Sequence, residues 1–352
     1  MKPFTRHALP GTVVFGHGAL AQLPEHVALL GAARPLLLAG ATPALTAQVE
    51  ALLPDRAGTW TDIRQHVPAE LADQCHQHAA DLGADLLVCV GGGSTTGLAK
   101  AVALRGGPRI LAVATTYAGS EMTPVWGQSQ GGVKRTGRDL RVLPATVLYD
   151  PELLAGLPAS VVGPSGMNAL AHCVEALYSA AAEPLSSLAA VEGARLLARH
   201  LPAAFSDADL SARGEVLWAS CLAGHVFGTV GGSLHHAVCH LLGGRHDLPH
   251  AETHAIVLPH VVQLLLPAVR EQLRPLADVL GVQPEGLPAA LWDIGAAVDT
   301  PTGLGAVGMP QADLPAAAQA LLDKDPPSPL PLTLSQTTRL LDDAFVGRRP
   351  VG

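Results

Sequence analysis

The chain has 352 residues, of which 48% are hydrophobic and 15% charged, and its formal net charge is −8 at pH 7. This length predicts two domains, and the acidic balance excludes nucleic acid as an expected partner, because binding to DNA or RNA requires a basic surface. The start, "MKPFTRHALPGTVVFG", lacks the apolar segment of a signal peptide, no apolar run is long enough for a membrane helix, and the five cysteines form no disulfide framework or CxxC motif. We therefore expect a cytoplasmic protein that does not bind membranes.

Short apolar runs alternate with helical patterns over the first 150 residues. We expect buried strands at 34–40, 84–94 and 109–116, with helical segments after the first two, and then a hairpin and a last strand within 131–151. Runs of Val and Leu without polar alternation are typical of a parallel sheet that is covered on both faces.

The pattern changes after residue 150, where the segment 157–166 carries two prolines and two glycines. Beyond it the sequence has helical periodicity, with expected helices at 166–182, 184–200, 209–228 and 233–242 and others towards the end. The Pro-rich segment 324–335 is typical of a surface connection before a closing helix. The sequence thus predicts an α/β dinucleotide-binding domain over 1–158 and an all-helical substrate domain over 159–352.

A glycine-rich loop follows the second expected strand, in "VCVGGGSTTGLAKA". Three residues without side chains let the backbone approach a pyrophosphate closely, and the helix that follows offers N–H donors and the positive end of its dipole. The pattern matches neither GxGxxG nor GxxxxGK[ST], and a tight strand–helix turn that binds nothing is the alternative. The candidate cofactor residues here are Gly91, Gly92, Gly93, Ser94 and Thr95.

The third expected strand ends in "ATTYAGSEMTP", which places Thr115, Thr116 and Ser120 at its carboxyl end. Ligands of open α/β sheets bind outside these carboxyl ends, and small hydroxyl groups suit a nicotinamide carboxamide or phosphate. Helix capping is an alternative explanation of the same residues.

Seven of the sixteen histidines lie between His235 and His260, in and after "LHHAVCHLLGGRHDLPHAETHA". Such a run is compatible with a metal site, with a site that transfers protons, or with chance. A second segment, "SGMNALAHCVEALY", adds Asn168 and His172, which share one face of a helix because they are four residues apart. Glu175 in the same segment is expected to orient a histidine or to form a pair on the helix surface.

Four motifs together, "GGGSTTGLAKA", "TTYAGSEMTPVWG", "SGMNALAHCVEALY" and "LHHAVCHLLGG…LPHAETHAIVLPH", resemble the maleylacetate reductases. These form a branch of the iron-containing alcohol dehydrogenase superfamily, and the resemblance extends over essentially the whole chain. It implies the dehydroquinate synthase-like fold of that superfamily, with an N-terminal nucleotide-binding domain, a helical C-terminal domain and a homodimeric state. The implied activity is reduction of maleylacetate to 3-oxoadipate by NADH or NADPH, in bacterial degradation of aromatic compounds.

The resemblance also implies roles for the candidate cofactor residues. The glycine loop would hold the pyrophosphate, Thr115, Thr116 and Ser120 would line the nicotinamide, and Lys134 would lie near the ribose. Many relatives carry an acidic residue after the first strand, which binds the adenosine 2′-hydroxyl, whereas Gly40 or Ala41 stands there in this chain. We therefore expect weak discrimination between NADH and NADPH.

Metal-dependent relatives bind their ion through one Asp and three His. The matching positions here are Asn168, His172, His236 and His250, so that an amide replaces the anionic ligand. A neutral amide is a poor ligand for a hard divalent cation, although three histidines can hold zinc. We expect no metal requirement.

The chemistry of maleylacetate reduction makes a metal less necessary. Hydride addition at the carbon β to the ketone of maleylacetate gives a delocalised enolate, which hydrogen-bond donors stabilise and a proton donor completes. We expect His172, His236, His240, His250 and Asn168 to serve these roles, without an assignment of the proton donor. The substrate is a small dicarboxylate, for which Arg138 and Arg245 are further candidate partners or merely surface charges.

Three other functions remain open from the sequence. One is a metal-dependent alcohol or polyol dehydrogenase, against which Asn168 argues. Another is a lyase of the dehydroquinate synthase type, against which the low lysine content of the helical domain argues. The third is a catalytically inactive relative that serves as a binding protein.

Overall fold

The computed structural model describes residues 4, 6, 8–131, 133–206 and 209–351, apart from the side chains of residues 133 and 134. The chain forms two compact units, one of residues 8–157 and one of residues 158–351 together with residues 4 and 6. Arg6 joins the second unit through an ion pair of 3.3 Å with Glu183. The units divide one residue before the boundary expected from the sequence.

The first unit is built on a six-stranded sheet in which all neighbouring strands pair in parallel. In spatial order the strands are β1 (Thr12–Phe15), β8 (Thr146–Tyr149), β5 (Arg109–Ala114), β4 (Leu86–Gly91), β2 (Pro35–Ala39) and β3 (Gly58–Trp60). The expected strands correspond to β2, β4, β5 and β8, and this prediction is confirmed. The edge strands β1 and β3 were not expected, because each is only three or four residues long and neither is fully buried.

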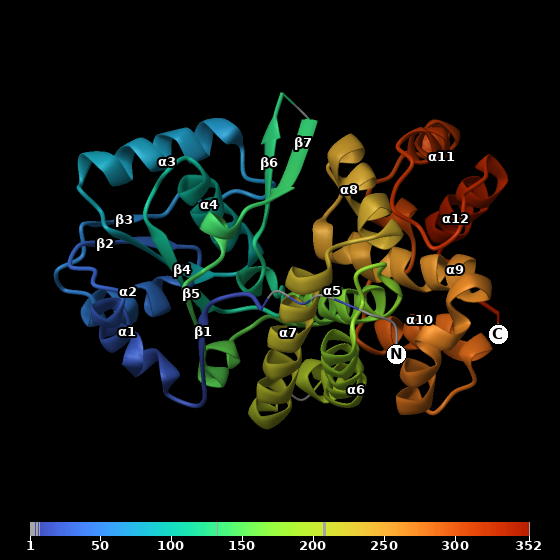
Figure 1. The fold of residues 1–352 in the computed structure, drawn as a ribbon, viewed down its shortest axis with the longest axis horizontal. Coiled ribbons are helices and arrows are strands. Elements are labelled where there is room, and N and C mark those ends of the chain that lie inside the picture. Colours follow the sequence, from blue (N-terminus) through green and yellow to red (C-terminus); the bar gives the residue numbers. More distant parts are fainter. Residues whose placement is uncertain (1–3, 5, 7, 132, 207–208, 352) are drawn as a thin grey trace. The chain divides into compact units, whose positions relative to one another are not determined.

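Helices cover both faces of this sheet (Figure 1). They are α1 (Leu23–Leu29), α2 (Pro43–Leu52), α3 (Ala69–Asp81) and α4 (Gly93–Leu104). The start of α2 shows how the sequence sets a boundary, since the Thr42 side chain accepts a hydrogen bond from the backbone N–H of Leu45 and Pro43 occupies the first helical turn.

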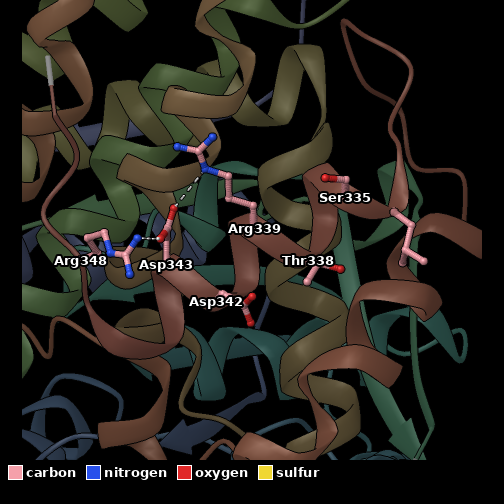
Figure 2. Close-up of a pocket in the computed structure, with 7 residues that line it drawn as sticks. Ser335, Thr338, Arg339, Asp342, Asp343 and Arg348 are labelled. Carbon is pink, nitrogen blue, oxygen red and sulfur yellow. Dashed lines mark ion pairs between the residues drawn. The ribbon is translucent and has the colours of Figure 1, made fainter.

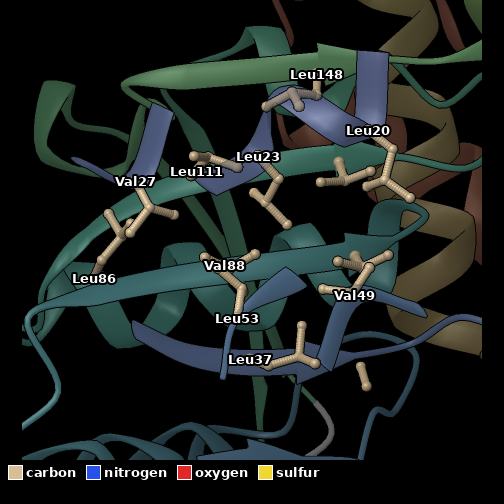
Figure 3. Packing of buried hydrophobic residues seen from close by; sticks show 13 residues of the cluster. Leu20, Leu23, Val27, Leu37, Val49, Leu53, Leu86, Val88, Leu111 and Leu148 are labelled. Carbon is tan, nitrogen blue, oxygen red and sulfur yellow. The ribbon is translucent and has the colours of Figure 1, made fainter. Parts of the chain in front are cut away.

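A hydrophobic cluster fills the space between the sheet and the helices α1 and α2 (Figure 3). Strand residues such as Leu37, Val88 and Leu111 meet Leu23 of α1 and Val49 of α2, and all five are fully buried. This packing explains why the expected strands lack polar alternation, because their other face is also covered by helices.

A hairpin joins β5 to β8 and consists of β6 (Val125–Gln130) and β7 (Val133–Arg138) in antiparallel register. The expected hairpin lay within 131–151, so the prediction placed it too late in the sequence. Gly131 follows β6 rather than opening the first strand, since Gln130 ends β6 and pairs directly with Val133. Gly131 has a φ of +56°, a conformation that favours glycine.

The second unit is helical. Its helices are α5 (Ala159–Tyr178), α6 (Pro184–Ser206), α7 (Leu210–Val230), α8 (Leu234–His246), α9 (His250–Leu280), α10 (Leu287–Ala297), α11 (Leu314–Asp323) and α12 (Leu334–Val346). Short 3₁₀ helices of the two units lie at Ala19–Gln22, Ser120–Met122, Leu140–Val142, Pro151–Leu154, Pro284–Gly286, Leu304–Val307 and Gln311–Asp313. The Pro-rich connection expected before the closing helix is confirmed between α11 and α12.

The segment 157–166, at which we expected the domain boundary, contains that boundary and is helical from residue 159 onward. It forms the first two turns of α5, with Pro164 inside the helix. The glycines of this segment allow close contacts with other parts of the unit. A Cβ on Gly163 would collide with the carbonyl of Val298, and a Cβ on Gly166 would collide with the side chain of Leu201.

Helix α9 contains the most apolar stretch of the chain and is long and apolar enough to cross a membrane by length and composition alone. However, 67% of its most apolar window is buried inside the protein. A helix that is hydrophobic around much of its circumference is typical of a core element, and α9 packs against α5, α8 and α10.

Candidate functional site

The glycine loop lies at the junction of β4 and α4 in the α/β unit. Gly91 ends β4 and Gly93 begins α4, without a side-chain cap at Gly92. A Cβ on Gly91 would collide with Thr95, and a Cβ on Gly92 would lie 2.9 Å from the Thr116 hydroxyl oxygen. The loop is therefore closely packed on its protein side and leaves the N–H groups of the first α4 turn uncapped by side chains, which is the arrangement that phosphate-binding loops use.

The end of β2 lies beside this loop. The backbone N–H of Gly40 donates to the Val90 carbonyl at 2.9 Å, and a Cβ on Gly40 would collide with the Thr95 hydroxyl. An acidic residue at position 40 would thus have to displace Thr95. The structure gives a steric reason for the missing carboxylate that the sequence showed.

The candidate hydroxyl residues gather at the ends of β4 and β5. The N–H of Thr115 donates to the Gly91 carbonyl at 3.2 Å, and Thr116 lies against Gly92. Ser120 begins a 3₁₀ helix after β5, and Ser94 lies on the first turn of α4. The candidate Lys134 belongs to β7, but its side chain lies outside the described residues.

Lys100 on α4 holds this segment in place, and the sequence analysis missed it. Its ammonium group donates to the carbonyl of Ser120 at 2.6 Å, to the hydroxyl of Thr123 at 2.9 Å and to the carbonyl of Val125 at 2.8 Å. The side chain is only 1% exposed, and this burial lowers the pKa of Lys100 to about 7. A single lysine within the apolar run "GLAKAVAL" was the available signal.

Replacing Lys100 with methionine is expected to weaken NADH binding and to change the pH dependence of stability. The pKa of Lys100 is lower in the folded chain than the ordinary lysine value of 10.5, so the unfolded chain binds more protons between about pH 7 and 10. The stability of the wild type should therefore rise with pH relative to the variant, by at most about 1.4 kcal/mol per pH unit. Urea unfolding at pH 7 and 9 measures this difference, with Lys324→Met as the exposed control. If the difference in stability between the wild type and Lys100→Met is the same at pH 7 and pH 9, the prediction is wrong.

Replacing Gly91 with alanine is expected to raise the KM for NADH by at least about tenfold, because the added methyl group collides with Thr95 and shifts the loop. The control is Gly156→Ala in the same unit, where no described atom lies within 4 Å of the added Cβ. Steady-state kinetics at saturating substrate test this pair. Equal effects of both variants would mean that the close packing at Gly91 has no role in cofactor binding.

The other candidate residues lie in the helical unit. Asn168, His172 and Glu175 occupy successive turns of α5, and they are 3%, 5% and 0% exposed. The expected helix face shared by Asn168 and His172 is thus confirmed, and it is buried. Helix α5 packs against α6, α7 and α9, which surround it with other helices of the unit.

Glu175 binds the start of α8. One carboxylate oxygen accepts from the backbone N–H of Ser233 at 2.7 Å, and the other binds Nδ1 of His236. Burial raises the pKa of Glu175 to about 6, so the carboxylate is largely ionised at neutral pH. A carboxylate at a helix N-terminus is favourable, and a carboxylate on one imidazole nitrogen sets the tautomer and orientation of the ring. The expectation that Glu175 orients a histidine is confirmed, and the surface-pair alternative was wrong.

Imidazole rings from three helices form a single cluster around His236. The ring centroid of His236 lies 5.1 Å from that of His172, 5.8 Å from that of His240 and 4.6 Å from that of His254. The ring of His250 lies 4.3 Å from His254 and 6.2 Å from His240. The structure thus brings His172, His236, His240 and His250 together, as the proposed site requires.

Two histidines that the sequence analysis assigned to no defined role lie at the centre of this cluster. His235 and His254 are fully buried, and Nε2 of His235 lies 2.9 Å from Nδ1 of His254. The position of His254, one helical turn after His250, was a signal that could have placed it in the cluster.

Two of the buried histidines, His172 and His254, are held neutral. Burial lowers the pKa of His172 well below its ordinary value, with a smaller contribution from the nearby His236, and burial likewise lowers the pKa of His254. The ring of His172 stacks on Phe227 of α7 with centroids 4.6 Å apart. His172 is therefore a neutral hydrogen-bonding group.

The four positions that hold the metal in metal-dependent relatives carry no carboxylate in this chain. They offer one amide and three imidazoles, and the carboxylate of Glu175 binds Nδ1 of His236. Hard divalent cations favour oxygen ligands with negative charge. The residues present do not fit the cation that the family name implies.

Two other features of the helical unit lie apart from this chemistry. Arg245, a candidate for substrate binding, forms two hydrogen bonds of 2.5 and 3.0 Å with Asp313 at the surface. A surface hollow of about 610 Å³ is lined by residues of α12 and by Arg348, and none of the clustered histidines belongs to its lining (Figure 2). Asp343 in this hollow forms ion pairs with Arg348 and Arg339.

Comparison with known proteins identifies the family to which this fold and site belong. Residues 10–151 match the iron-containing alcohol dehydrogenase family, and residues 163–345 match the C-terminal part of the iron-containing alcohol dehydrogenase family. The chain therefore belongs to the iron-containing alcohol dehydrogenase family.

Within this family the chain belongs with the maleylacetate reductases. It is 46% identical to maleylacetate reductase 2 of Cupriavidus pinatubonensis over 99% of both chains, and 43% identical to the maleylacetate reductase of Burkholderia cepacia over 99% of this chain and all of the relative. The crystal structure of maleylacetate reductase from Agrobacterium tumefaciens superposes with a TM-score of 0.92 at 41% identity, covering 99% of this chain and 100% of that one.

Proposed function

We propose that this protein reduces the C=C bond of maleylacetate to give 3-oxoadipate, with NADH or NADPH as the hydride donor, in bacterial degradation of aromatic compounds. One hydride and one proton add across the double bond, and the nicotinamide is oxidised. The observation that carries the proposal is the cluster of imidazoles around a histidine that Glu175 orients, in a chain more than 40% identical to named maleylacetate reductases.

The cluster suits the two tasks that follow hydride transfer. Hydride arrives at the carbon β to the ketone, and the resulting enolate carries its charge over carbon and oxygen. Asn168 and His172 are neutral side chains on one helix face, suited to donating hydrogen bonds to the enolate oxygen. Because Glu175 binds Nδ1 of His236, proton transfer to the α-carbon is assigned to Nε2 of His236 or to the neighbouring His240 or His250.

The cofactor is assigned to the α/β unit. The loop of Gly91, Gly92 and Gly93 with Ser94 and Thr95 binds the pyrophosphate, and Thr115, Thr116 and Ser120 line the nicotinamide. Because Thr95 fills the space beside Gly40, no carboxylate stands there to repel a 2′-phosphate, which supports use of both NADH and NADPH.

We also propose that the enzyme is a cytoplasmic homodimer and that it uses no metal. All five cysteines are free and buried, as is typical of a reducing compartment. The lack of a carboxylate among Asn168, His172, His236 and His250 supports catalysis without an ion, because an enolate needs less charge stabilisation than the alkoxide of an alcohol dehydrogenase.

The test is NADH oxidation by the purified protein with maleylacetate, with and without EDTA. We expect turnover that EDTA does not change and no comparable rate with simple alcohols or polyols in the reverse direction. Activity that disappears with EDTA and returns with iron or zinc would indicate a metal-dependent alcohol dehydrogenase. NADH binding by fluorescence without any turnover would indicate an inactive binding relative.

Replacing Asn168 with aspartate is expected to increase the affinity for Zn²⁺ or Fe²⁺ at these four positions by at least about tenfold, because it restores the anionic ligand. Metal content after dialysis against a limiting concentration of the ion measures the effect, with Asn168→Leu as the control. Equal metal content in Asn168→Asp and wild type would contradict the ligand arrangement.

A further inference from the structure

A second group of potential metal ligands lies within the helical unit, separate from the four positions described above. His235 and Cys239 are one turn apart on α8, and His254 lies on the second turn of α9. Their ligand atoms all lie within 4.8 Å of one another, and all three side chains are buried. The sulfur of Cys239 is 3.8 Å from Nε2 of His235, which in turn is 2.9 Å from Nδ1 of His254.

The donor set is that of a soft or borderline divalent cation. A thiolate supplies the negative charge that Asn168 does not, and thiolate with imidazole is the combination that zinc prefers. Zinc lies about 2.0–2.1 Å from imidazole nitrogen and about 2.3 Å from sulfur, so two of its ligand atoms are about 3.3–3.7 Å apart. The pair of Cys239 and His235 is already near this separation, and the two histidines need to separate by only a few tenths of an ångström.

The two histidines share one hydrogen bond, between Nε2 of His235 and Nδ1 of His254, and both rings are fully buried. Among the described residues, Nδ1 of His235 and Nε2 of His254 have no hydrogen-bond partner. An ion that binds between the rings of His235 and His254 would replace only the one hydrogen bond that the two rings share.

We propose that His235, Cys239 and His254 form a binding site for Zn²⁺ or a similar soft divalent cation. Three protein ligands leave the fourth coordination position to water or to an anion. The site is distinct from that of the metal-dependent relatives, because none of its ligands occupies one of those four positions. It does not rest on the proposed function.

Occupation of this site acts on the histidine cluster. The ring of His254 is in contact with those of His236 and His250, at centroid distances of 4.6 and 4.3 Å. His250, whose ring contacts that of His254, is exposed at the surface. When His254 binds the ion, its ring can no longer change orientation relative to His236 and His250. The bound ion therefore inhibits any reaction that uses His236.

Cobalt is the probe, because a thiolate bound to Co²⁺ gives a charge-transfer absorption band that histidine ligands alone do not give. We expect the metal-free wild-type protein to bind one equivalent of Co²⁺ with this band, and Zn²⁺ to displace it. Cys239→Ser should remove the band and weaken binding by roughly 100-fold. Cys221→Ser, which changes another buried cysteine in the same unit, should retain both.

The alternative outcomes overturn the proposal in different ways. Absence of Co²⁺ binding by the wild type, or a band that survives in Cys239→Ser, shows that these residues form no metal site. Binding without a thiolate band that is lost in His172→Ala places the ion at the family's position instead. Circular dichroism confirms that each variant is folded, and Cys239→Ala repeats the test with a side chain that tolerates the apolar surroundings.

Discussion

Replacing His236 with alanine is expected to lower kcat for maleylacetate by about 10²–10⁴-fold, while the Kd for NADH stays within about twofold of the wild type. The reason is its place in the structure, since His236 is the histidine that a buried carboxylate orients and that lies in ring contact with His172, His240 and His254. The residues assigned to NADH lie in the other unit of the chain. Stopped-flow kinetics and NADH fluorescence titration measure the two quantities separately.

The control for this experiment is His200→Ala, which removes a histidine of α6 from the same unit. Its kcat should remain within about twofold of the wild type. If His236→Ala loses NADH binding to the same degree as turnover, the histidine cluster contributes to folding or to the cofactor site and the proposed catalytic role is wrong.

Replacing Glu175 with glutamine is expected to lower kcat by about 10–100-fold with little change in the Kd for NADH. The amide oxygen can still accept from the N–H of Ser233, but the amide group carries no charge and can present an N–H to His236, which then loses the tautomer that the carboxylate selects. Glu175→Leu should add a loss of stability of about 1–3 kcal/mol, because it leaves the N–H of Ser233 without its acceptor. Steady-state kinetics and urea unfolding measure the two effects.

Glu192→Gln is the matched control, since Glu192 forms an exposed pair with Arg195 on α6 and should matter little for activity or stability. If Glu175→Gln is fully active, the contact between Glu175 and His236 serves only to attach α8. If Glu175→Gln is as unstable as Glu175→Leu, the effect on kcat cannot be assigned to the orientation of His236.

Local patterns were sufficient to predict the sheet and most helices. The runs "PLLLA" and "LLVCV" became β2 and β4 because strands buried on both faces have no polar side to alternate with. The start of α5 was mispredicted because Pro and Gly usually end helices, whereas Gly163 and Gly166 here allow close contacts with Val298 and Leu201. Those contacts join segments far apart in the chain and leave no local signal.

The sequence by itself determined which side chains were available for chemistry. Loss of the anionic ligand at Asn168, the spacing of Asn168 and His172 on one helix face and the run of histidines after Leu234 are all visible without coordinates, because ligand type and helical spacing are local properties. The resemblance to the maleylacetate reductases was likewise visible from the sequence alone.

Only the tertiary structure decided what these side chains do to one another. It made Glu175 the partner of His236, tied Lys100 to the segment after β5, and brought His254 of α9 against His235 of α8. Each of these contacts joins residues that are 19 or more positions apart. The pKa of each buried group is also raised or lowered by what surrounds the group in space. The neighbours of a buried group in the folded protein cannot be identified from the residues next to it in the sequence.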